Sequence, residues 1–354
     1  MRECEWKLLP SDEVLTYSGR IDFTQKDAPV FVFPCTSVRF HVTGKNIRVD
    51  LENIRSYWEN SMGILVDGDY KGKCILPDEG RLEIDISGFL DGKEHDLTIF
   101  KRQDACHYVR FFGLLVGKDT TVTKSTLHYT RRIEVYGDSV SAGEVSEAVA
   151  YAGLADPEHN GEYSNSFYSY SWTCARKLQA EIHDIAQGGI SLFSGQGYFL
   201  QPDTLGMEAC YDKIEYNPAL GETKEWDFSQ YTPHVVIVAI GQNDANPVNY
   251  MALDYDGEEA ERWRTAYQNW IRLLREKYPH SEIILTTTIL NHDPAWDRAI
   301  GEVADKLQDT HVHHFLYRNN GSGTHGHIRI PEAEQMAEEL SGFIRSLGEE
   351  IWKD

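Results

Sequence analysis

The feature of this sequence that most constrains its fold is a change of hydrophobic period near residues 120–131. Before that point, short segments are apolar throughout or alternate between apolar and polar residues, and turns rich in Gly, Asp and Asn separate them. Many short strands at this spacing are typical of a β-sandwich. We therefore predict a jelly-roll-like sandwich domain over residues 1–128. The expected strands lie at 30–33, 38–42, 47–51, 63–67, 82–86, 96–100 and 111–116.

After the change, apolar runs alternate with helical patterns. Residues 235–240 and 283–288 are continuous apolar runs, as strands covered on both faces require. Between 258 and 278 the apolar residues recur at intervals of three and four, and Pro331 opens a similar pattern at the end of the chain. Strands that alternate with helices predict a three-layer α/β domain with a parallel sheet over residues 129–354. Further strands are expected at 133–136, 181–185 and 313–317.

Polar clusters follow three of these strands. Gly137-Asp138-Ser139 follows the first, Gly241-Gln242-Asn243-Asp244 follows the run that ends at residue 240, and Gly326-His327 precedes the last helix. Ligands of open parallel sheets bind beyond the carboxyl ends of the strands. We therefore expect these clusters, which are far apart in the sequence, to meet at one edge of the sheet.

The segments that carry these clusters resemble those of the SGNH (GDSL-type) hydrolases. IEVYGDSVSAGE resembles the nucleophile segment and implies that Ser139 is the nucleophile. IAQGGISLFSG, at 185–195, resembles the segment that bears the family's glycine, best matched by Gly189. AIGQNDAN implies Asn243, and GHIRIPEAEQMAEEL implies His327 as the catalytic base. All four segments occur in the order of that family.

A β-sandwich ahead of an SGNH domain is similar to the arrangement of carbohydrate esterase family 2, whose members deacetylate xylan and related sugars. The stretches GILVDGDY and DGKEHDLTIFKR of the first half are also similar to that family. The resemblance implies a serine esterase that removes acetyl groups from xylan or related plant polysaccharides and oligosaccharides. It implies a Ser-His dyad or triad and no cofactor.

Elementary chemistry explains why such a reaction needs each of these residue types. A serine hydroxyl is a poor nucleophile until a base takes its proton, and histidine titrates in the useful range. The attacked carbonyl becomes an oxyanion, which needs preorganised donors. The backbone N–H groups of Ser139 and Gly189 and the side-chain amide of Asn243 would form this oxyanion hole. Asp138 and Asp244 are interpreted as structural hydrogen-bond acceptors.

The sequence departs from the SGNH pattern at the acid of the triad. Three residues before His327, where the family commonly carries aspartate, stands Thr324. Some relatives in carbohydrate esterase family 2 orient the histidine with a backbone carbonyl, which makes the carbonyl of His325 one candidate to hold His327. An acid from elsewhere in the chain is the alternative. His325 is itself the alternative base, because Gly323-Thr324-His325 resembles the Gly-x-His ending of many SGNH enzymes.

The histidines near the C-terminus raise the question of a metal. His311, His313, His314, His325 and His327 lie close together in sequence, but no Cys is near them and the only plain acid is Asp309. We therefore expect no metal site and treat zinc as the less favoured alternative.

Two other functions remain open. One is a GDSL-type lipase or thioesterase that acts on other short acyl esters, and the other is a non-catalytic carbohydrate-binding protein.

The net charge of the chain limits the kinds of molecule that it is expected to bind. A formal net charge of -22 repels phosphate backbones, so we expect no nucleic-acid partner. No apolar stretch is long enough to cross a membrane, and MRECEWKLLP lacks the apolar region of a signal peptide. The six cysteines are far apart and form no C-x-x-C pair. We expect a cytoplasmic protein of bacterial origin that binds acetylated carbohydrate, with no membrane partner. Whether it forms a homo-oligomer is left open.

Overall fold

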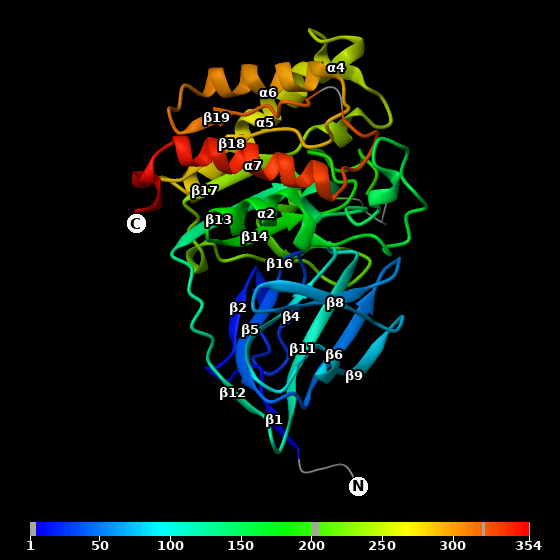
Figure 1. Ribbon diagram of the computed structural model, residues 1–354. Helices are drawn as coiled ribbons and strands as arrows, with labels where there is room; N and C mark the ends of the chain where they lie inside the picture. The colour runs from blue at the N-terminus through cyan, green and yellow to red at the C-terminus, as the bar shows by residue number, and fades with distance from the viewer. Residues whose placement is uncertain (1–4, 200–204, 321–322, 354) are drawn as a thin grey trace.

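The computed structural model of the protein describes residues 5–199, 205–320 and 323–353. The β-sandwich and the α/β domain are stacked end to end, with β1 (Glu5–Leu8) at the far tip of the sandwich (Figure 1). The boundary predicted between residues 128 and 129 falls in the connection between β12, which ends at Thr123, and β13, which begins at Arg131. The predicted pairing of an all-β domain with an α/β domain is confirmed.

Two six-stranded antiparallel sheets form the sandwich. Their facing side chains, among them Phe40, Val49 and Leu114, form one buried hydrophobic core, as the alternating pattern requires. A short helix, η1 (Ser87–Phe89), follows β9. The first sheet has the order β3 (Ile21–Asp22), β4 (Val30–Phe31), β11 (His107–Gly117), β6 (Ile47–Arg55) and β9 (Gly80–Asp85), with β1 (Glu5–Leu8) beside β11. The second has the order β12 (Thr121–Thr123), β5 (Ser37–Thr43), β10 (Glu94–Lys101), β7 (Ser61–Val66) and β8 (Asp69–Ile75), with β2 (Thr16–Ser18) beside β5.

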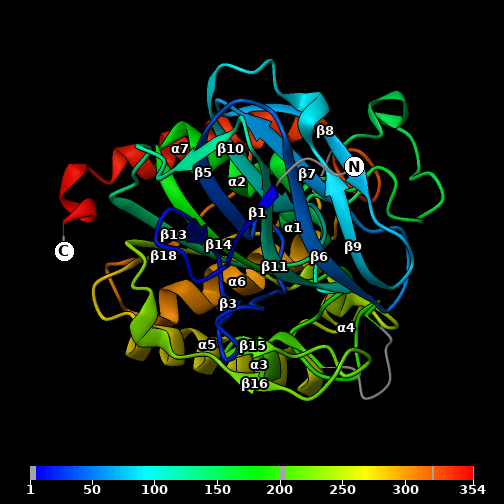
Figure 2. The ribbon, with the colours of Figure 1, turned by 90° about the horizontal axis from the view of Figure 1, so that it is seen from below.

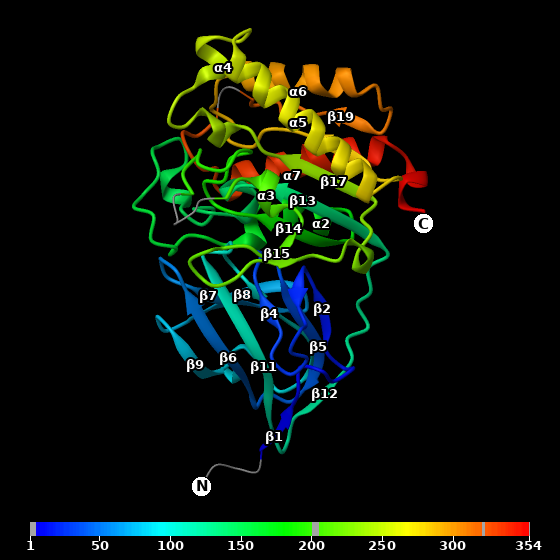
Figure 3. The same ribbon diagram turned by 180° about the vertical axis from the view of Figure 1, so that it is seen from behind.

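The α/β domain is a five-stranded parallel sheet between two helical layers (Figures 1 and 3). The strand order is β14 (Ala180–Ala186), β13 (Arg131–Gly137), β17 (Val235–Ala239), β18 (Glu282–Leu285) and β19 (Val312–His314). Helices α2 (Tyr170–Lys177) and α7 (Ile330–Ser346) cover one face, and α5 (Glu258–Lys277) and α6 (Pro294–Leu307) cover the other. Every residue of β17 is buried, which explains its continuous apolar run.

Shorter elements fill the connections of this domain. They are α1 (Ser139–Ala142), η2 (Val149–Tyr151), η3 (Ser166–Tyr168), α3 (Met207–Cys210), β15 (Lys213–Glu215), β16 (Lys224–Glu225), η4 (Phe228–Gln230), η5 (Gln242–Ala245), α4 (Tyr250–Leu253) and η6 (Glu349–Trp352). None of the described helices combines the length and the apolar composition that crossing a bilayer requires. Five of the six cysteines are free thiols, and Cys4 lies outside the described residues.

The strand order places two of the predicted clusters side by side. β13 comes first in the chain and lies between β14 and β17, so the direction of winding reverses between β13 and β17. Ser139 follows β13 and Asn243 follows β17, at the carboxyl ends of these two neighbouring strands. A crevice at such a reversal is the usual ligand site of an open α/β sheet.

Buried polar contacts join the two domains. Arg20, between β2 and β3, is fully buried and donates to Glu134 Oε1 at 3.0 Å and to the Tyr136 hydroxyl at 2.7 Å, both on β13. The Tyr108 hydroxyl on β11 accepts from the backbone N–H of Tyr216 at 2.9 Å. Seen from below, the strands of the sandwich lie across the sheet of the α/β domain (Figure 2). The loops at this end of the sandwich therefore lie close to the parallel sheet.

Candidate active site

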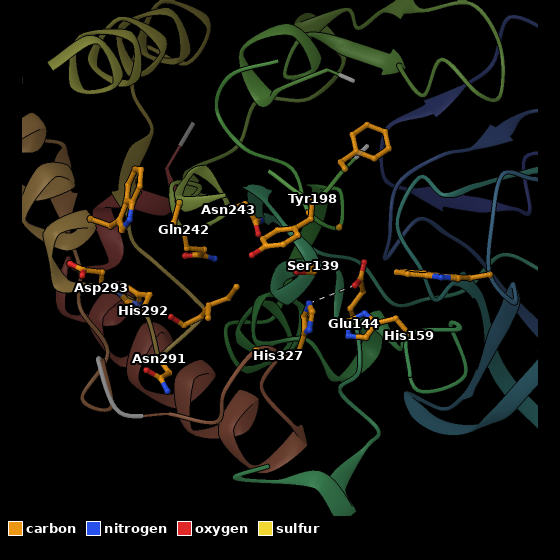
Figure 4. A pocket seen from close by; sticks show the side chains of 18 of the residues that line it. Ser139, Glu144, His159, Tyr198, Gln242, Asn243, Asn291, His292, Asp293 and His327 are labelled. Atoms are coloured by element: carbon orange, nitrogen blue, oxygen red, sulfur yellow. Dashed lines mark hydrogen bonds and ion pairs between the residues drawn. The ribbon is translucent and has the colours of Figure 1, made fainter. Parts of the chain in front are cut away.

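A cavity of about 690 Å³ opens at the carboxyl edge of the parallel sheet (Figure 4). All four residues of the predicted site, Ser139, Gly189, Asn243 and His327, line it. The sandwich domain also contributes, because the loop between β6 and β7 places Tyr57 and Trp58 in the lining. The remaining lining residues are Glu144, His159, Gly188, Tyr198, Phe199, Gln242, Ala245, Ile289, Asn291, His292, Asp293, Trp296 and Gly326.

A tight strand-to-helix turn positions Ser139. The Asp138 carboxylate caps α1 by accepting from the Val140 N–H at 3.0 Å, so Ser139 is the first residue of the helix. The turn needs glycine at its start, because a Cβ on Gly137 would lie 2.1 Å from Ser141 Oγ. Ser139 is buried except toward the cavity that it lines.

Gly189 adopts a conformation that favours glycine. Its φ is +73°, and a Cβ there would lie 2.7 Å from the backbone nitrogen of Phe199. The backbone N–H groups of Ser139 and Gly189 have no hydrogen-bond acceptor among the described residues. Two unpaired N–H groups beside a serine hydroxyl are what an oxyanion hole requires.

The side-chain amide of Asn243 donates two hydrogen bonds within the protein. Its Nδ2 donates to Asp138 Oδ2 at 3.1 Å and to the Ile190 carbonyl at 3.0 Å. Asp138 also accepts from Gln242 Nε2 at 2.5 Å, and burial raises the pKa of Asp138 to about 7. Both amide hydrogens of Asn243 thus have partners, so an oxyanion would have to share one of them.

Asp244 has the structural role expected of it. Its carboxylate accepts from the Leu192 N–H at 3.0 Å and from the indole N–H of Trp263 at 3.0 Å. Burial raises the pKa of Asp244 to about 7. These bonds fasten the loop after β14 to helix α5, and they hold Asp244 away from the cavity, whose lining does not include it.

The partner of His327 differs from the sequence expectation. His327 Nδ1 lies 2.7 Å from Oδ2 of Asp156, and its Nε2 has no hydrogen-bond partner among the described residues. Of the two candidates to orient His327, the His325 carbonyl is therefore not the one that the structure contains. Thr324 occupies the position of the family's usual acid, but its hydroxyl accepts from the Gly153 N–H. The alternative, an acid from elsewhere in the chain, is what the structure contains.

Asp156 is held in place from several directions. Its Oδ1 accepts from Arg329 Nη2 at 2.8 Å, and its Oδ2 lies 3.2 Å from His159 Nε2. Burial alone would raise the pKa of Asp156, but the hydrogen bonds from His159, His327 and Arg329 outweigh it and hold the pKa well below the ordinary value. Burial lowers the pKa of His327, and Asp156 opposes that shift without cancelling it. At neutral pH the pair is therefore a carboxylate beside a neutral imidazole.

His325 lies away from this arrangement. Its side chain is exposed, its ring contacts the Asn291 amide at 2.8 Å, and it is not part of the cavity lining. Of the two candidate bases, His327 is the one that shares a cavity with Ser139. Figure 4 shows the His327 ring pointing toward Ser139 and Glu144. No Ser139–His327 hydrogen bond is present among the described residues, which is common before substrate binds.

His311, just before β19, and His313, in β19, lie elsewhere. His311 Nδ1 and His313 Nε2 each contact one oxygen of Glu282, at 2.8 and 2.7 Å, near the opposite ends of β18 and β19 from the cavity. Among the described residues, the one group close enough to share a metal ion is Asp156, His159 and His327. Its atoms already pair with one another, so hydrogen bonding accounts for the cluster without a metal.

Sequence reasoning missed Asp156, Glu144, Trp58 and Tyr198. Asp156 and Glu144 belong to the connection between α1 and α2. Trp58 belongs to a sandwich loop, where its own φ of 61° is in the left-handed region. No periodicity marks these positions, and only Glu144 falls within a quoted motif, as the last residue of IEVYGDSVSAGE. Only His159, three residues after Asp156, offered a local hint that a polar site was near.

Comparisons with known proteins agree with this geometry. Residues 17–125, most of the sandwich, match the family model described as carbohydrate esterase 2 N-terminal. The cellulase/esterase CelE of Acetivibrio thermocellus is 26% identical over 343 residues, which are 94% of this chain and 39% of CelE. The chain resembles carbohydrate esterase family 2 across both domains. The resemblance predicted from the sequence is thereby confirmed.

Two further comparisons extend the likeness. The acetylxylan esterase / glucomannan deacetylase of Cellvibrio japonicus is 24% identical over 341 residues, covering 95% of this chain and 90% of that protein. The structure of a family two carbohydrate esterase from Clostridium thermocellum in complex with cellohexaose superposes with a TM-score of 0.77 and 24% identity. It covers 96% of this chain and 100% of that one. The fold is therefore shared, and the named relatives support the class of carboxylic ester hydrolase.

Proposed function

We propose that this protein is a serine esterase that removes acetyl groups from xylan or a related polysaccharide or its oligosaccharides. The observation that carries the proposal is the cavity in which Ser139, His327 and the unpaired N–H groups of Ser139 and Gly189 converge. Asp156 adds a third member to the Ser-His pair. The relative from Cellvibrio japonicus, named as an acetylxylan esterase / glucomannan deacetylase, supports the substrate class.

In the proposed reaction, Ser139 Oγ attacks the acetyl carbonyl while His327 Nε2 takes its proton. Asp156 accepts the Nδ1–H of His327, which leaves Nε2 as the basic nitrogen and stabilises the imidazolium once it forms. The oxyanion is stabilised by the N–H groups of Ser139 and Gly189, with Asn243 as the third donor. The sugar oxygen leaves with the proton from His327. Water, activated by His327, then hydrolyses the acetyl-serine and releases acetate.

The rim of the cavity suits a sugar. Trp58 and Tyr198 line it, and aromatic faces pack well against the apolar faces of pyranose rings. Asn291 and Asp293 line the same cavity and offer partners for hydroxyl groups. Tyr198 is 64% exposed, so its ring is available to a polymer that runs across the opening. The sandwich thereby forms part of the substrate site.

The test compares acyl chain lengths. Initial rates are measured on acetyl, butyryl and octanoyl esters and on acetylated xylan, with Ser139→Ala as the inactive control. We expect acetyl esters to be cleaved much faster than octanoyl esters, and acetylated xylan to release acetate. Octanoyl rates equal to or above acetyl rates would favour the lipase alternative. Binding of xylan or cellohexaose with no release of acetate would favour the non-catalytic alternative.

A further inference from the structure

Glu144 is a buried acid beside the proposed catalytic base. It follows Gly143, the left-handed residue that ends α1, and its backbone N–H donates to the Ser139 carbonyl at 2.9 Å. Its Oε2 lies 3.6 Å from His327 Nε2, the nitrogen that would take the proton of Ser139, and Figure 4 marks this contact. Its Oε1 is buried and receives no hydrogen bond from any described donor.

The carboxyl group of Glu144 meets that of Asp104, from the sandwich loop between β10 and β11. A Cβ on Gly188 would lie 1.9 Å from Glu144 Oε1 and 2.9 Å from Asp104 Oδ2. Both oxygens therefore lie on the same side of this glycine, close to each other. Asp104 is supplied with donors: its Oδ2 accepts from the Gly188 N–H at 2.6 Å and from Gln187 Nε2 at 2.8 Å, and its Oδ1 accepts from the Cys106 N–H at 3.0 Å.

Two carboxyl groups that touch in a buried site cannot both be ionised. Asp104 already accepts three N–H bonds, whereas Glu144 accepts none from the described residues, so Glu144 is the partner left to donate in the contact between them. The proton therefore belongs to Glu144. Burial and the neighbouring charge of Asp104 raise the pKa of Glu144 well above its ordinary value. Asp138 and Asp156 add smaller negative contributions of the same sign.

We propose that Glu144 is a positioning residue that keeps its carboxyl proton, donates a hydrogen bond from that O–H to Asp104 and so presents a neutral oxygen to His327. The inference rests on the proposed esterase function, because it concerns the base of that reaction. A neutral neighbour leaves the imidazole unprotonated and free to take the proton of Ser139. Through Asp104, the sandwich domain thereby keeps Glu144 protonated and His327 neutral.

An ionised Glu144 would have the opposite effect. A carboxylate at this distance favours imidazolium, and an opposite charge within hydrogen-bonding range typically shifts a pKa by about 1–3 units. Asp156, His159 and Arg329 also act on the pKa of His327. Since these stay in place when Glu144 or Asp104 is changed, a change in the His327 pKa reports on Glu144.

The experiment is an NMR titration of the His327 ring in the full chain, with the resonance assigned by His327→Gln. In Asp104→Asn, the new amide can donate to Glu144 and favours its ionised form, so we expect the His327 pKa to rise by about one unit or more. In the double variant Asp104→Asn/Glu144→Gln it should return to the wild-type value. Glu144→Gln alone should not lower it. Glu158→Gln, which removes an exposed acid from the same loop, is the matched control for net charge.

Two results would overturn the inference. A fall of the His327 pKa by one unit or more in Glu144→Gln would mean that Glu144 is ionised in the native protein. An unchanged His327 pKa in folded Asp104→Asn would mean that Asp104 does not control Glu144. If Asp104→Asn does not fold, Glu144→Gln alone still decides whether Glu144 is neutral. The titration needs no turnover, so its outcome is separate from that of the esterase assay.

Discussion

His327 Nδ1 lies 2.7 Å from Asp156 Oδ2, although the two residues are 171 positions apart in the chain. Arg329, two residues after His327, binds the other oxygen of the same carboxylate at 2.8 Å. The acid that completes the proposed triad is thus fixed by the segment that carries the base. It comes from the connection between α1 and α2, and not from the turn before the last helix.

Asp156→Asn should lower kcat strongly. An asparagine can donate to Nδ1 and hold the imidazole in the tautomer that cannot take the serine proton, and in a Ser-His-Asp triad this change lowers kcat by about 10⁴-fold. The measurement is kcat on an acetyl ester, with Glu158→Gln as the control. If Asp156→Asn keeps more than about a tenth of the wild-type kcat, the enzyme works with a dyad and Asp156 is structural.

His327→Ala should behave like Ser139→Ala. Members of one catalytic unit are not additive, so each single variant should lose about 10⁴-fold or more in kcat, and the double variant should be no worse than either. His325→Ala should cost much less, because its exposed ring lies outside the cavity. Activities are compared after circular dichroism has confirmed folding. An inactive His325→Ala beside an active His327→Ala would assign the base to His325.

The value of kcat/KM should vary with pH in proportion to the fraction of His327 that is unprotonated. Burial lowers the pKa of His327 below its usual 6.5, so the active, unprotonated imidazole persists into mildly acidic solution. The rate should stay constant from neutral pH down to below 6.5 and then fall as the pH drops through the lowered pKa. Asp156→Asn removes a negative charge beside His327, so it should shift the midpoint of this acidic fall in kcat/KM to a lower pH. A wild-type midpoint above 6.5 contradicts the prediction.

Asn243→Ala should reduce kcat more than it raises KM. An oxyanion donor acts on charge that develops in the transition state, and losing one typically costs about 10²–10³-fold in rate. The Asn243 amide also ties Asp138 to the Ile190 carbonyl, so thermal unfolding is measured alongside the kinetics. An effect confined to KM would show that Asn243 only holds substrate. A lower melting temperature with unchanged kcat would show a purely structural residue.

Much of this architecture could be predicted from local sequence patterns. The alternating segments became the strands of the sandwich, and the apolar run at 235–240 became the buried strand β17. The amphipathic pattern at 258–278 became α5, whose Trp263 and Trp270 lie in the core. The four segments implied by the resemblance meet at one edge because the carboxyl ends of parallel strands must.

The sequence alone determined the two fold classes and three of the polar clusters that gather at the carboxyl edge, because periodicity and strand ends are local properties of the chain. Only the tertiary structure decided which acid faces His327, that Trp58 of the sandwich lines the cavity, and that Asp104 meets Glu144. These residues belong to irregular loops, which carry no period. Their positions follow from how the two domains pack and from buried polar groups that must find partners.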